Sequence, residues 1–315
     1  MLSKANNNWE DNLFLKNLIF FIVLFFPGFA FSQQISDSTY NPMIDNPAYS
    51  IGHGPVVFID EGHNNYHTKD GRYKPFALLL EKDGYKVKGY KGKFRRKNLD
   101  KGKILVIANA LNKVNINNWT LPTPSAFTKA EIEVLRKWVS DGGSLFLIAD
   151  HMPWPGANAE LASVFGFKFY NGFNFDVINP AYFRVSDGTI AKNIITSGRN
   201  TSETIKEIPC TEGQAFQIPN DANPILIFDS SSMILLPDTS WVFNSDTKMI
   251  NIKGWCQGAY KKFGKGRVVV FGEASMFSAQ IGEPGKRKMG MNRFDAKDNH
   301  KLLLNIIHWL DRIIN

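Results

Sequence analysis

Residues 144–156 read Ser-Leu-Phe-Leu-Ile-Ala-Asp-His-Met-Pro-Trp-Pro-Gly, and this stretch decides the fold. The run 144–149 is short and apolar and follows an Asp-Gly-Gly turn at 141–143. This pattern is typical of a central strand in a parallel sheet that is covered on both faces. Asp150 and His151 come directly after the run. Because ligands of open α/β sheets bind beyond the carboxyl ends of the strands, this ionisable pair marks the expected position of a site.

Apolar strands alternate with helices on both sides of this stretch. The helix before it starts at Thr128 and Glu131, which have the spacing of a capping box. Right-handed crossovers between such units build a parallel sheet with helices on both faces. We therefore predict an α/β fold with a doubly wound, mostly parallel sheet. Its expected strands are 55–59, 85–88, 104–108, 144–149 and 266–272, and its expected helices are 75–83, the one that starts at 128, 157–165 and 298–313.

The region 167–265 contains short β-like runs that are broken by polar residues, and it has little helical period. Its clearest runs are 225–228, 233–236 and 256–260. We expect these runs to add antiparallel strands to one edge of the sheet. The glycine-rich, basic segment 282–293 is predicted to be a loop before the last helix.

The N-terminus has the pattern of a secretory signal peptide. Lys16 precedes an apolar run at 18–26, and Ala30 and Ser32 are small residues at the two positions that a signal peptidase reads. We predict cleavage after Ser32 and a periplasmic or extracellular mature protein. The alternative is an uncleaved N-terminal anchor. No later segment is long and apolar enough to span a bilayer. The mature chain then has an extended lead-in at 33–55 and a single domain at 56–315.

The chain is basic, with 37 Lys and Arg against 29 Asp and Glu and a net charge of +8. Much of the excess lies between Lys82 and Lys103, where Asp83 and Asp100 are the only acids. Such a patch either contacts anionic envelope glycans or lipid head groups or is a solvated edge of the sheet. Nucleic acid is not an expected partner of an exported protein. The two cysteines, Cys210 and Cys256, could form one disulfide in an oxidising compartment, and the sequence does not show whether they meet.

Three segments, 127–150, 264–277 and 299–310, carry a family resemblance. The first, 127–150, has the pattern of a helix, a Gly-Gly turn and an apolar strand. The second, 264–277, reads Gly-Lys-Gly-Arg-Val-Val-Val-Phe-Gly-Glu-Ala-Ser-Met-Phe. The third, 299–310, is an expected helix that ends in Leu-Leu-Leu-Asn-Ile-Ile-His-Trp-Leu. In these segments the chain resembles the class I glutamine amidotransferase-like superfamily, in particular its uncharacterised branch related to gliding-motility and intraflagellar-transport type domains. The resemblance implies the fold of residues 56–315. It implies little about activity, because one fold hosts many functions.

Amidotransferases of this superfamily use a cysteine on a tight turn between a strand and a helix. Residues 254–258, Gly-Trp-Cys-Gln-Gly, match the spacing of that turn. The turn needs a buried strand before it and a helix after it, whereas 249–253 alternates with polar residues and a second turn follows at 264–266. We therefore expect a hairpin that leads into the final strand, with Cys256 as a structural residue. Glutamine hydrolysis by a cysteine is not expected.

Polar residues follow four of the predicted strands. They are Asp60, Glu61, His63 and His67 after the first strand, Asn109 after the third, Asp150 and His151 after the fourth, and Glu273 and Ser275 after the last. We predict catalytic roles for Asp60, Asp150, His151 and Glu273 and binding roles for Glu61, Asn109 and Ser275. Carboxylates and imidazoles at one edge can act as acid and base or can hold a divalent metal ion. The candidate metal ligands are His63, His67, Asp150 and His151.

Each of these side chains also has a structural interpretation. Asp60 and Asp150 can cap helices or accept hydrogen bonds from loop amides, and the histidines can be partly buried loop residues. Glu273 can pair with Arg293 or Lys286. Two hypotheses about function therefore stand. One is an exported hydrolase, with or without a metal ion, that acts on an envelope or extracellular carbohydrate or ester. The other is a non-catalytic envelope module that binds a glycan or a protein.

Overall fold

A nine-stranded sheet forms the centre of the molecule. The computed structural model describes residues 34–176, 182–282 and 286–315. The sheet order is β3-β2-β4-β5-β15-β14-β10-β6, and β11 also pairs with β14. Five neighbouring strands, β3, β2, β4, β5 and β15, are parallel to one another. Strand β14 pairs antiparallel with β15. The bounds are β2 Val56–Asp60, β3 Lys86–Tyr90, β4 Ile104–Ala108, β5 Ser144–Ile148, β6 Lys168–Phe169, β10 Phe216–Gln217, β11 Asn223–Ile227, β14 Cys256–Phe263 and β15 Gly266–Phe271.

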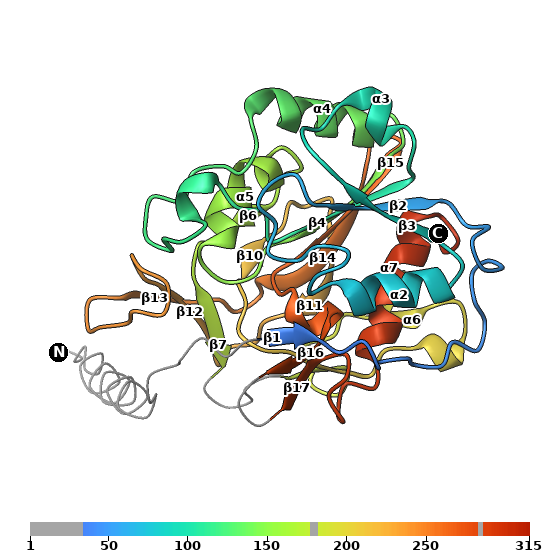
Figure 1. Cartoon of the computed structure of the whole chain (residues 1–315). Coiled ribbons are helices and arrows are strands. Elements are labelled where there is room, and N and C mark those ends of the chain that lie inside the picture. The colour runs from blue at the N-terminus through green and yellow to red at the C-terminus, as the bar shows by residue number, and fades with distance from the viewer. Residues whose placement is uncertain (1–33, 177–181, 283–285) are drawn as a thin grey trace.

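Helices cover both faces of this sheet (Figure 1), so the predicted doubly wound architecture is confirmed. One face carries α2 (Lys74–Lys82), α6 (Ile194–Ser197) and α7 (Asn299–Leu310), and the other carries α3 (Arg96–Leu99), α4 (Lys129–Ser140) and α5 (Trp154–Ser163). The predicted capping box is present at the start of α4. Helix α5 starts three residues earlier than predicted, at Trp154, and the short helix α3 was not predicted.

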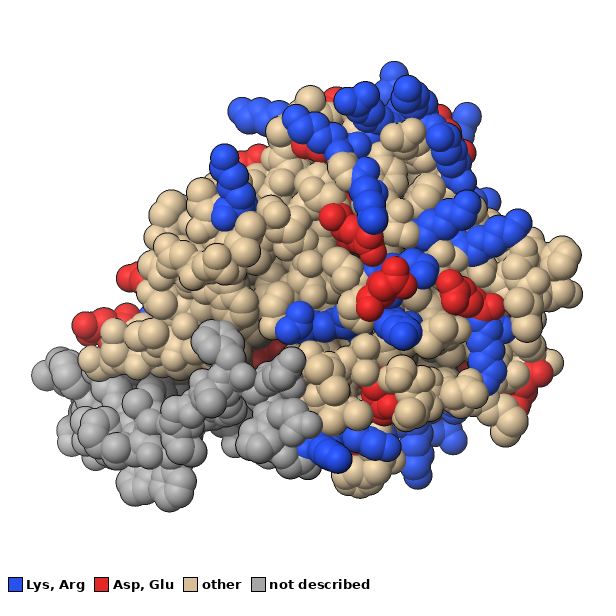
Figure 2. Space-filling model, viewed as in Figure 1, with Lys and Arg blue, Asp and Glu red and all other residues tan. Residues whose placement is uncertain are grey.

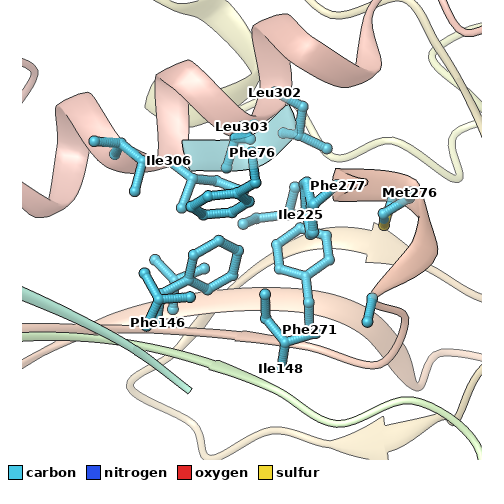
Figure 3. Packing of buried hydrophobic residues seen from close by; sticks show 14 of the residues in the cluster. Phe76, Phe146, Ile148, Ile225, Phe271, Met276, Phe277, Leu302, Leu303 and Ile306 are labelled. Atoms are coloured by element: carbon cyan, nitrogen blue, oxygen red, sulfur yellow. The ribbon is translucent and has the colours of Figure 1, made fainter. Parts of the chain in front are cut away.

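The larger core cluster lies between the sheet and helices α2 and α7. Figure 3 shows Leu302, Leu303 and Ile306 of α7 above Phe146 of β5 and Phe271 of β15. All five side chains are fully buried. The apolar stripe predicted for the last helix therefore closes one face of the sheet, and it fixes the direction in which the strands present their carboxyl ends.

Of the three runs expected to extend one edge of the sheet, 225–228 and 256–260 do so within β11 and β14, whereas 233–236 belongs to a separate sheet. Strand β14 pairs antiparallel with β15 through a tight turn, so the predicted hairpin is confirmed. A separate three-stranded sheet holds β7 (Phe173–Asp176), β12 (Ser232–Leu236) and β13 (Lys248–Asn251), and β8 (Tyr182–Arg184) pairs with β9 (Glu207–Pro209). The sheet of β7, β12 and β13 is joined to the segment just before the amino-terminal end of β14, which lies at the same edge as the carboxyl end of β15.

One expectation about the segments outside the central sheet needs correction. The lead-in begins with β1 (Gln34–Ser36), an extended strand that pairs with β16 (Ala279–Gly282). The segment 282–293 is not a loop throughout, because β17 (Arg287–Gly290) pairs antiparallel with β16. Backbone hydrogen bonds with β1 complete a three-stranded sheet there. The glycines and lysines of 282–293 gave a turn signal that this pairing overrides. The predicted signal peptide, residues 1–32, lies outside the described residues.

The two cysteines are not joined in a disulfide. Both are buried thiols, and they belong to different core clusters, since Cys210 packs in the cluster beneath α2 and α7 and Cys256 in the cluster beneath α4 and α5. Burial raises the pKa of Cys256 to about 12. A thiol with this pKa is almost never a thiolate at neutral pH, so Cys256 is a structural residue, as expected from the hairpin.

The basic residues of 82–103 lie on the outer side of β3 and α3. Figure 2 shows Lys and Arg side chains gathered over this part of the molecule. The exposed ones are Lys86, Lys88, Lys91, Lys93, Arg95, Arg96, Lys97 and Lys101. Arg96 pairs with Asp100 at 2.7 Å and also with Asp141. Within the described ranges, no helix is both long enough and apolar enough to cross a bilayer.

Candidate functional site

Four of the predicted polar residues lie along one edge of the sheet. Asp60 ends β2, Asn109 follows β4, and Asp150 and Glu273 stand two residues beyond β5 and β15. These four strands are neighbours in the sheet, so hydrogen bonds can run from one strand end to the next. Asn109 Oδ1 accepts from the N–H of Asp150 at 2.9 Å, and Asp150 Oδ2 accepts from the N–H of Ala274 at 3.1 Å. Hydrogen bonds therefore connect the ends of β4, β5 and β15, while Asp60 at the end of β2 bonds to His63 and Asn65.

His63 is fixed between two carboxylates. Its Nδ1 donates to the carboxylate of Asp60 at 2.9 Å, and its Nε2 donates to Oε1 of Glu131 at 3.2 Å. Phe94 and Phe127 pack on the ring, with centroids 4.4 and 4.9 Å away. Burial opposes the charged imidazole, but the hydrogen bonds and charges of Asp60 and Glu131 outweigh it and raise the pKa of His63. Both ring nitrogens therefore carry protons, and we call Asp60, His63 and Glu131 the histidine bridge.

His67 lies deeper, beside the aromatic ring of Tyr73. Its Nδ1 is 3.3 Å from Asn109 Nδ2, and its Nε2 is buried with no hydrogen-bond partner among the described residues. Burial, reinforced by the nearby Arg72 charge, lowers the pKa of His67 to about 3. The ring is therefore neutral at physiological pH, and it accepts from the Asn109 amide through Nδ1.

Asp150 and Glu273 form an acid pair at the ends of β5 and β15. Burial and then the neighbouring Glu273 charge raise the pKa of Asp150 well above its ordinary value. Burial also raises the pKa of Glu273 to about 7, although the hydroxyls of Ser275 and Thr211 donate to its Oε1 and oppose the shift. Two like charges cannot both be stabilised in this buried environment, so the pair holds at least one proton near neutral pH.

The predicted metal site is not assembled. In the parts of the chain that the structure describes, no three His, Cys, Asp or Glu side chains are placed to hold a metal ion. The physical reason lies in the partners of the four candidates. Both nitrogens of His63 are engaged by carboxylates, Asp150 accepts from two backbone N–H groups, and His151 turns away toward aromatic rings. His67 keeps one buried nitrogen, Nε2, without a partner among the described residues.

The two remaining predicted binding residues differ in position. Ser275 lies within the acid pair's network, where its hydroxyl donates to Glu273 and lies 2.9 Å from the hydroxyl oxygen of Thr211. Glu61 turns outward over β3, where Oε1 accepts from the N–H of Lys69 at 2.9 Å. Its carboxylate lies against Gly89, which has no side chain to displace it. Glu61 therefore holds a loop and does not take part in the site.

His151 belongs to an aromatic cluster on the outer side of the edge. Its ring stacks on Phe173, with centroids 4.5 Å apart and an interplanar angle of 17°. Trp154 and Trp241 contact the same ring, at 4.9 and 4.8 Å. Tyr66, Trp119 and Phe243 extend the cluster. His151 Nδ1 donates to the carbonyl of Met152 at 2.7 Å, and burial lowers the pKa of the ring to about 4. Its Nε2 is therefore a lone-pair acceptor at neutral pH.

Sequence reasoning missed most of this cluster and all of the residues that come from the antiparallel half. Trp154, Phe173 and Trp241 have no common spacing, because they come from a helix, a short strand and a loop. Glu131 was identified only as a helix cap. Thr211 had no signal in the sequence. A concentration of tryptophan in predicted loops, at Trp119 and Trp241, was the one usable indication.

Comparisons with known proteins support the fold and do not identify a function. No protein-family model matches the chain, and no curated protein matches it by sequence. The solved structure of the "mmIFT52 N-terminal domain" is similar, with a TM-score of 0.57 and 16% identity over 81% of this chain and 96% of that one. A putative ThuA-like protein from Bacteroides uniformis covers 86% of this chain and 94% of its own, at 11% identity and a TM-score of 0.44. At such identities the likeness concerns the fold alone.

Proposed function

We propose that this protein binds a carbohydrate through the aromatic cluster around His151. The observation that carries the proposal is Trp241, which is 45% exposed although its ring packs on His151 and Phe173. A rigid, exposed indole on an aromatic base offers a flat apolar face to the C–H groups of a sugar ring. Aromatic side chains supply large contact area with little loss of conformational entropy.

The backbone of Trp241 supports a functional role for this ring. Its φ is +66°, a left-handed conformation that costs a bulky L residue about 1 to 2 kcal/mol. Ser240 holds the segment by donating from Oγ to the carbonyl of Met152 at 2.7 Å. The same carbonyl accepts from His151. The residue before Trp241 is therefore linked to His151 through one shared carbonyl group.

The two loops beside the cluster have the composition expected at a sugar-binding surface. They run side by side, because the N–H of Leu121 donates to the carbonyl of Asp238 and the N–H of Ser240 donates to the carbonyl of Trp119. Residues 112–125 contain a single charged residue, Lys113, among Asn, Thr and Ser. Amide and hydroxyl groups can donate to and accept from sugar hydroxyls. The neutral Nε2 of His151 adds an acceptor at the centre.

Titration with soluble oligosaccharides tests this function. The probes are gluco-, manno- and N-acetylglucosamine oligomers, and the readouts are tryptophan fluorescence and calorimetry. We expect at least one series to bind, and Trp241→Ala to weaken that binding about thirtyfold, the loss of about 2 kcal/mol typical of a central aromatic contact. Phe294→Ala is the matched control, because Phe294 is 93% exposed and makes no contact with the cluster in the described structure. Equal affinity of the two variants would disprove the assignment.

Hydrolysis of a carbohydrate or ester is the second candidate. It is favoured by Glu273, because a carboxyl group with a pKa of about 7 can give and take a proton at neutral pH. The hydroxyl of Thr211 donates to this carboxyl group and positions it. Glu273→Gln should abolish hydrolysis of a bound oligosaccharide and leave its affinity unchanged. Binding without any turnover by the wild-type protein would favour the non-catalytic module.

Export and membership of the class I glutamine amidotransferase-like superfamily are further parts of this proposal. An exported module would meet glycans in the envelope or outside the cell. The exposed lysines of β3 and α3 would then contact anionic envelope groups, because opposite charges attract over about 8 to 10 Å at physiological ionic strength. Replacement of Lys86, Lys88 and Lys91 by Gln should lower retention on an anionic polymer such as heparin, and should leave oligosaccharide binding unchanged.

A further inference from the structure

A cavity of about 130 Å³ lies beside β14, on the antiparallel side of the sheet. An engineered cavity of about 150 Å³ in another protein holds one benzene molecule, so this volume suits a ligand of about six heavy atoms. We call it the Gln257 cavity. The described residues that line it come from β7, β8, β11, β12, β14 and the loops between them. They are Asn174, Phe175, Tyr182, Phe183, Asp187, Thr189, Cys210, Thr211, Glu212, Ile227, Phe228, Asp229, Ser232 and Gln257.

Gln257 has an amide whose hydrogen-bonding groups are unused. The residue is fully buried, and neither Nε2 nor Oε1 has a hydrogen-bond partner among the described residues. Each buried polar atom left in this condition costs about 1 to 3 kcal/mol. Gly213 allows the amide to sit there, because a Cβ on that residue would lie 2.8 Å from Gln257 Nε2 and 2.3 Å from the carbonyl oxygen of Gly272. The backbone therefore leaves room for the amide at the cavity wall.

The charged residues that line the Gln257 cavity are all acidic, while Arg184 and Arg293 contact the Tyr182 ring of its wall. Asp187, Glu212 and Asp229 line it, and none of the lining residues described is Lys or Arg. Asp187 and Asp229 each also accept hydrogen bonds from nearby Thr or Ser hydroxyls, which fixes their carboxylates. The field of Glu212 reaches the interior, since it contributes to the raised pKa of both Asp150 and Glu273. A cation is therefore the favoured occupant.

Aromatic rings supply the rest of the wall. Phe175, Tyr182, Phe183 and Phe228 line the cavity, and Phe183 packs edge-on against Phe228 with centroids 5.3 Å apart. Aromatic faces attract ammonium groups as well as apolar carbons. The cavity thus combines three carboxylates, aromatic faces and one amide that needs both a donor and an acceptor.

We propose that the Gln257 cavity binds a small primary ammonium compound that also carries a carboxamide, of the amino acid amide class. A carboxamide pairs with the Gln257 side chain through two antiparallel N–H···O bonds, which would satisfy both of its atoms. The ammonium group would face the carboxylates of Glu212 and Asp229. This site is separate from the aromatic cluster, and the proposal does not depend on carbohydrate binding.

Three small probes separate the contributions of charge and amide. Glycinamide carries both groups, acetamide only the carboxamide, and ethylammonium only the charge. Calorimetric titration of the full chain at slightly acidic pH keeps the glycinamide amine protonated. We expect glycinamide to bind at least tenfold more tightly than either of the other probes, because each lacks an interaction worth about 1.5 kcal/mol.

Gln257→Met is the diagnostic variant, because methionine keeps the length of the side chain and removes both polar atoms. It should lower the affinity for glycinamide at least tenfold and leave the affinity for ethylammonium nearly unchanged. Gln217→Met is the matched control, since Gln217 stands on the neighbouring strand β10 and faces Tyr170. Asp229→Asn should weaken both cations and spare acetamide.

The outcomes are distinct from those of the carbohydrate experiments. Trp241→Ala should not change glycinamide binding, so a failure of the carbohydrate proposal leaves this one standing. If wild-type protein binds no glycinamide at the highest concentration it tolerates, the proposal is overturned. The same holds if Gln257→Met and Gln217→Met bind it equally well, because the orphan amide would then have no part in recognition.

Discussion

Glu131 is the residue whose replacement tests the histidine bridge most directly. Its carboxylate accepts from the backbone N–H and hydroxyl of Thr128 at 3.1 and 2.6 Å, from the N–H of Phe94 at 3.2 Å and from His63 Nε2 at 3.2 Å. Glu131→Ala leaves the His63 ring and the Phe94 N–H buried without this acceptor. Removing one partner of a buried pair costs about 3 to 5 kcal/mol. We therefore expect the free energy of unfolding to fall by about 4 kcal/mol.

Urea unfolding followed by circular dichroism measures this change, and the same helix provides the control. Glu133 is an exposed residue of α4 that pairs with Arg136 at 2.7 Å, and its replacement by Ala should change the stability little. A loss for Glu131→Ala that is no larger than the loss for Glu133→Ala would refute the interpretation. In that case the aromatic neighbours of His63 would hold its ring, and its contact with Glu131 would contribute nothing to the free energy of unfolding.

The pH dependence of the same variant adds a second check. The pKa of His63 is raised in the folded protein, so its contribution is present in full below its unfolded pKa of about 6.5 and is lost as the pH rises through the folded value. The pKa of Glu131 is lowered, so its contribution is present above about 4.5 and is lost as the pH falls through the folded value. The stability difference between wild type and Glu131→Ala should therefore be largest between about pH 5 and 6.5.

Two further predictions concern the acid pair and the Gln257 cavity. The folded pKa of Glu273 is about 7, above its unfolded value, so the folded protein binds the extra proton and stability falls as the pH rises from about 4.5 to 7. Glu273→Gln should remove a penalty on the order of 3 kcal/mol at pH 8 and little at pH 4, which a series of melting curves would reveal; parallel curves for the two proteins would contradict it. Without ligand, Gln257→Met should raise the free energy of unfolding by about 1 to 3 kcal/mol, because it replaces an unpaired buried amide. If urea titration gives a lower free energy of unfolding for the variant than for the wild type, solvent satisfies the amide and the prediction is wrong.

The parallel half of the fold was predictable because its sequence signals are local. The apolar runs of β4 and β5 are fully buried on both faces, as their composition indicated. The Thr128 and Glu131 spacing gave the start of α4. The glycines at 282 and 290 misled, since they flank paired strands. Pairing with β1 joins residues that are far apart in the sequence, and no local pattern reports it.

The candidate site also has a part that the sequence predicts and a part that it does not. The positions of Asp60, Asn109, Asp150 and Glu273 followed from the rule that parallel strands end at one edge. Their partners did not follow, because hydrogen bonds to Glu131 or Thr211 depend on how loops cross that edge. The sequence therefore predicted that these acidic side chains follow neighbouring strands. It did not predict which groups they would bond to.

A metal site and a structural network place similar demands on sequence, and the four candidate metal ligands belong to such a network or to the aromatic cluster instead of forming one group. Parallel strands expose backbone N–H and C=O groups at their carboxyl ends, and buried groups of this kind need partners. Asp150 meets that need by accepting from the backbone N–H groups of His151 and Ala274, and Asn109 does so by accepting from the N–H of Asp150. A side chain used in this way is no longer available to a metal ion. What remains accessible is the ring of His151, whose lone pair and aromatic neighbours favour recognition of a ligand. The chemistry available at this edge therefore depends on which polar side chains are not already hydrogen-bonded to the backbone.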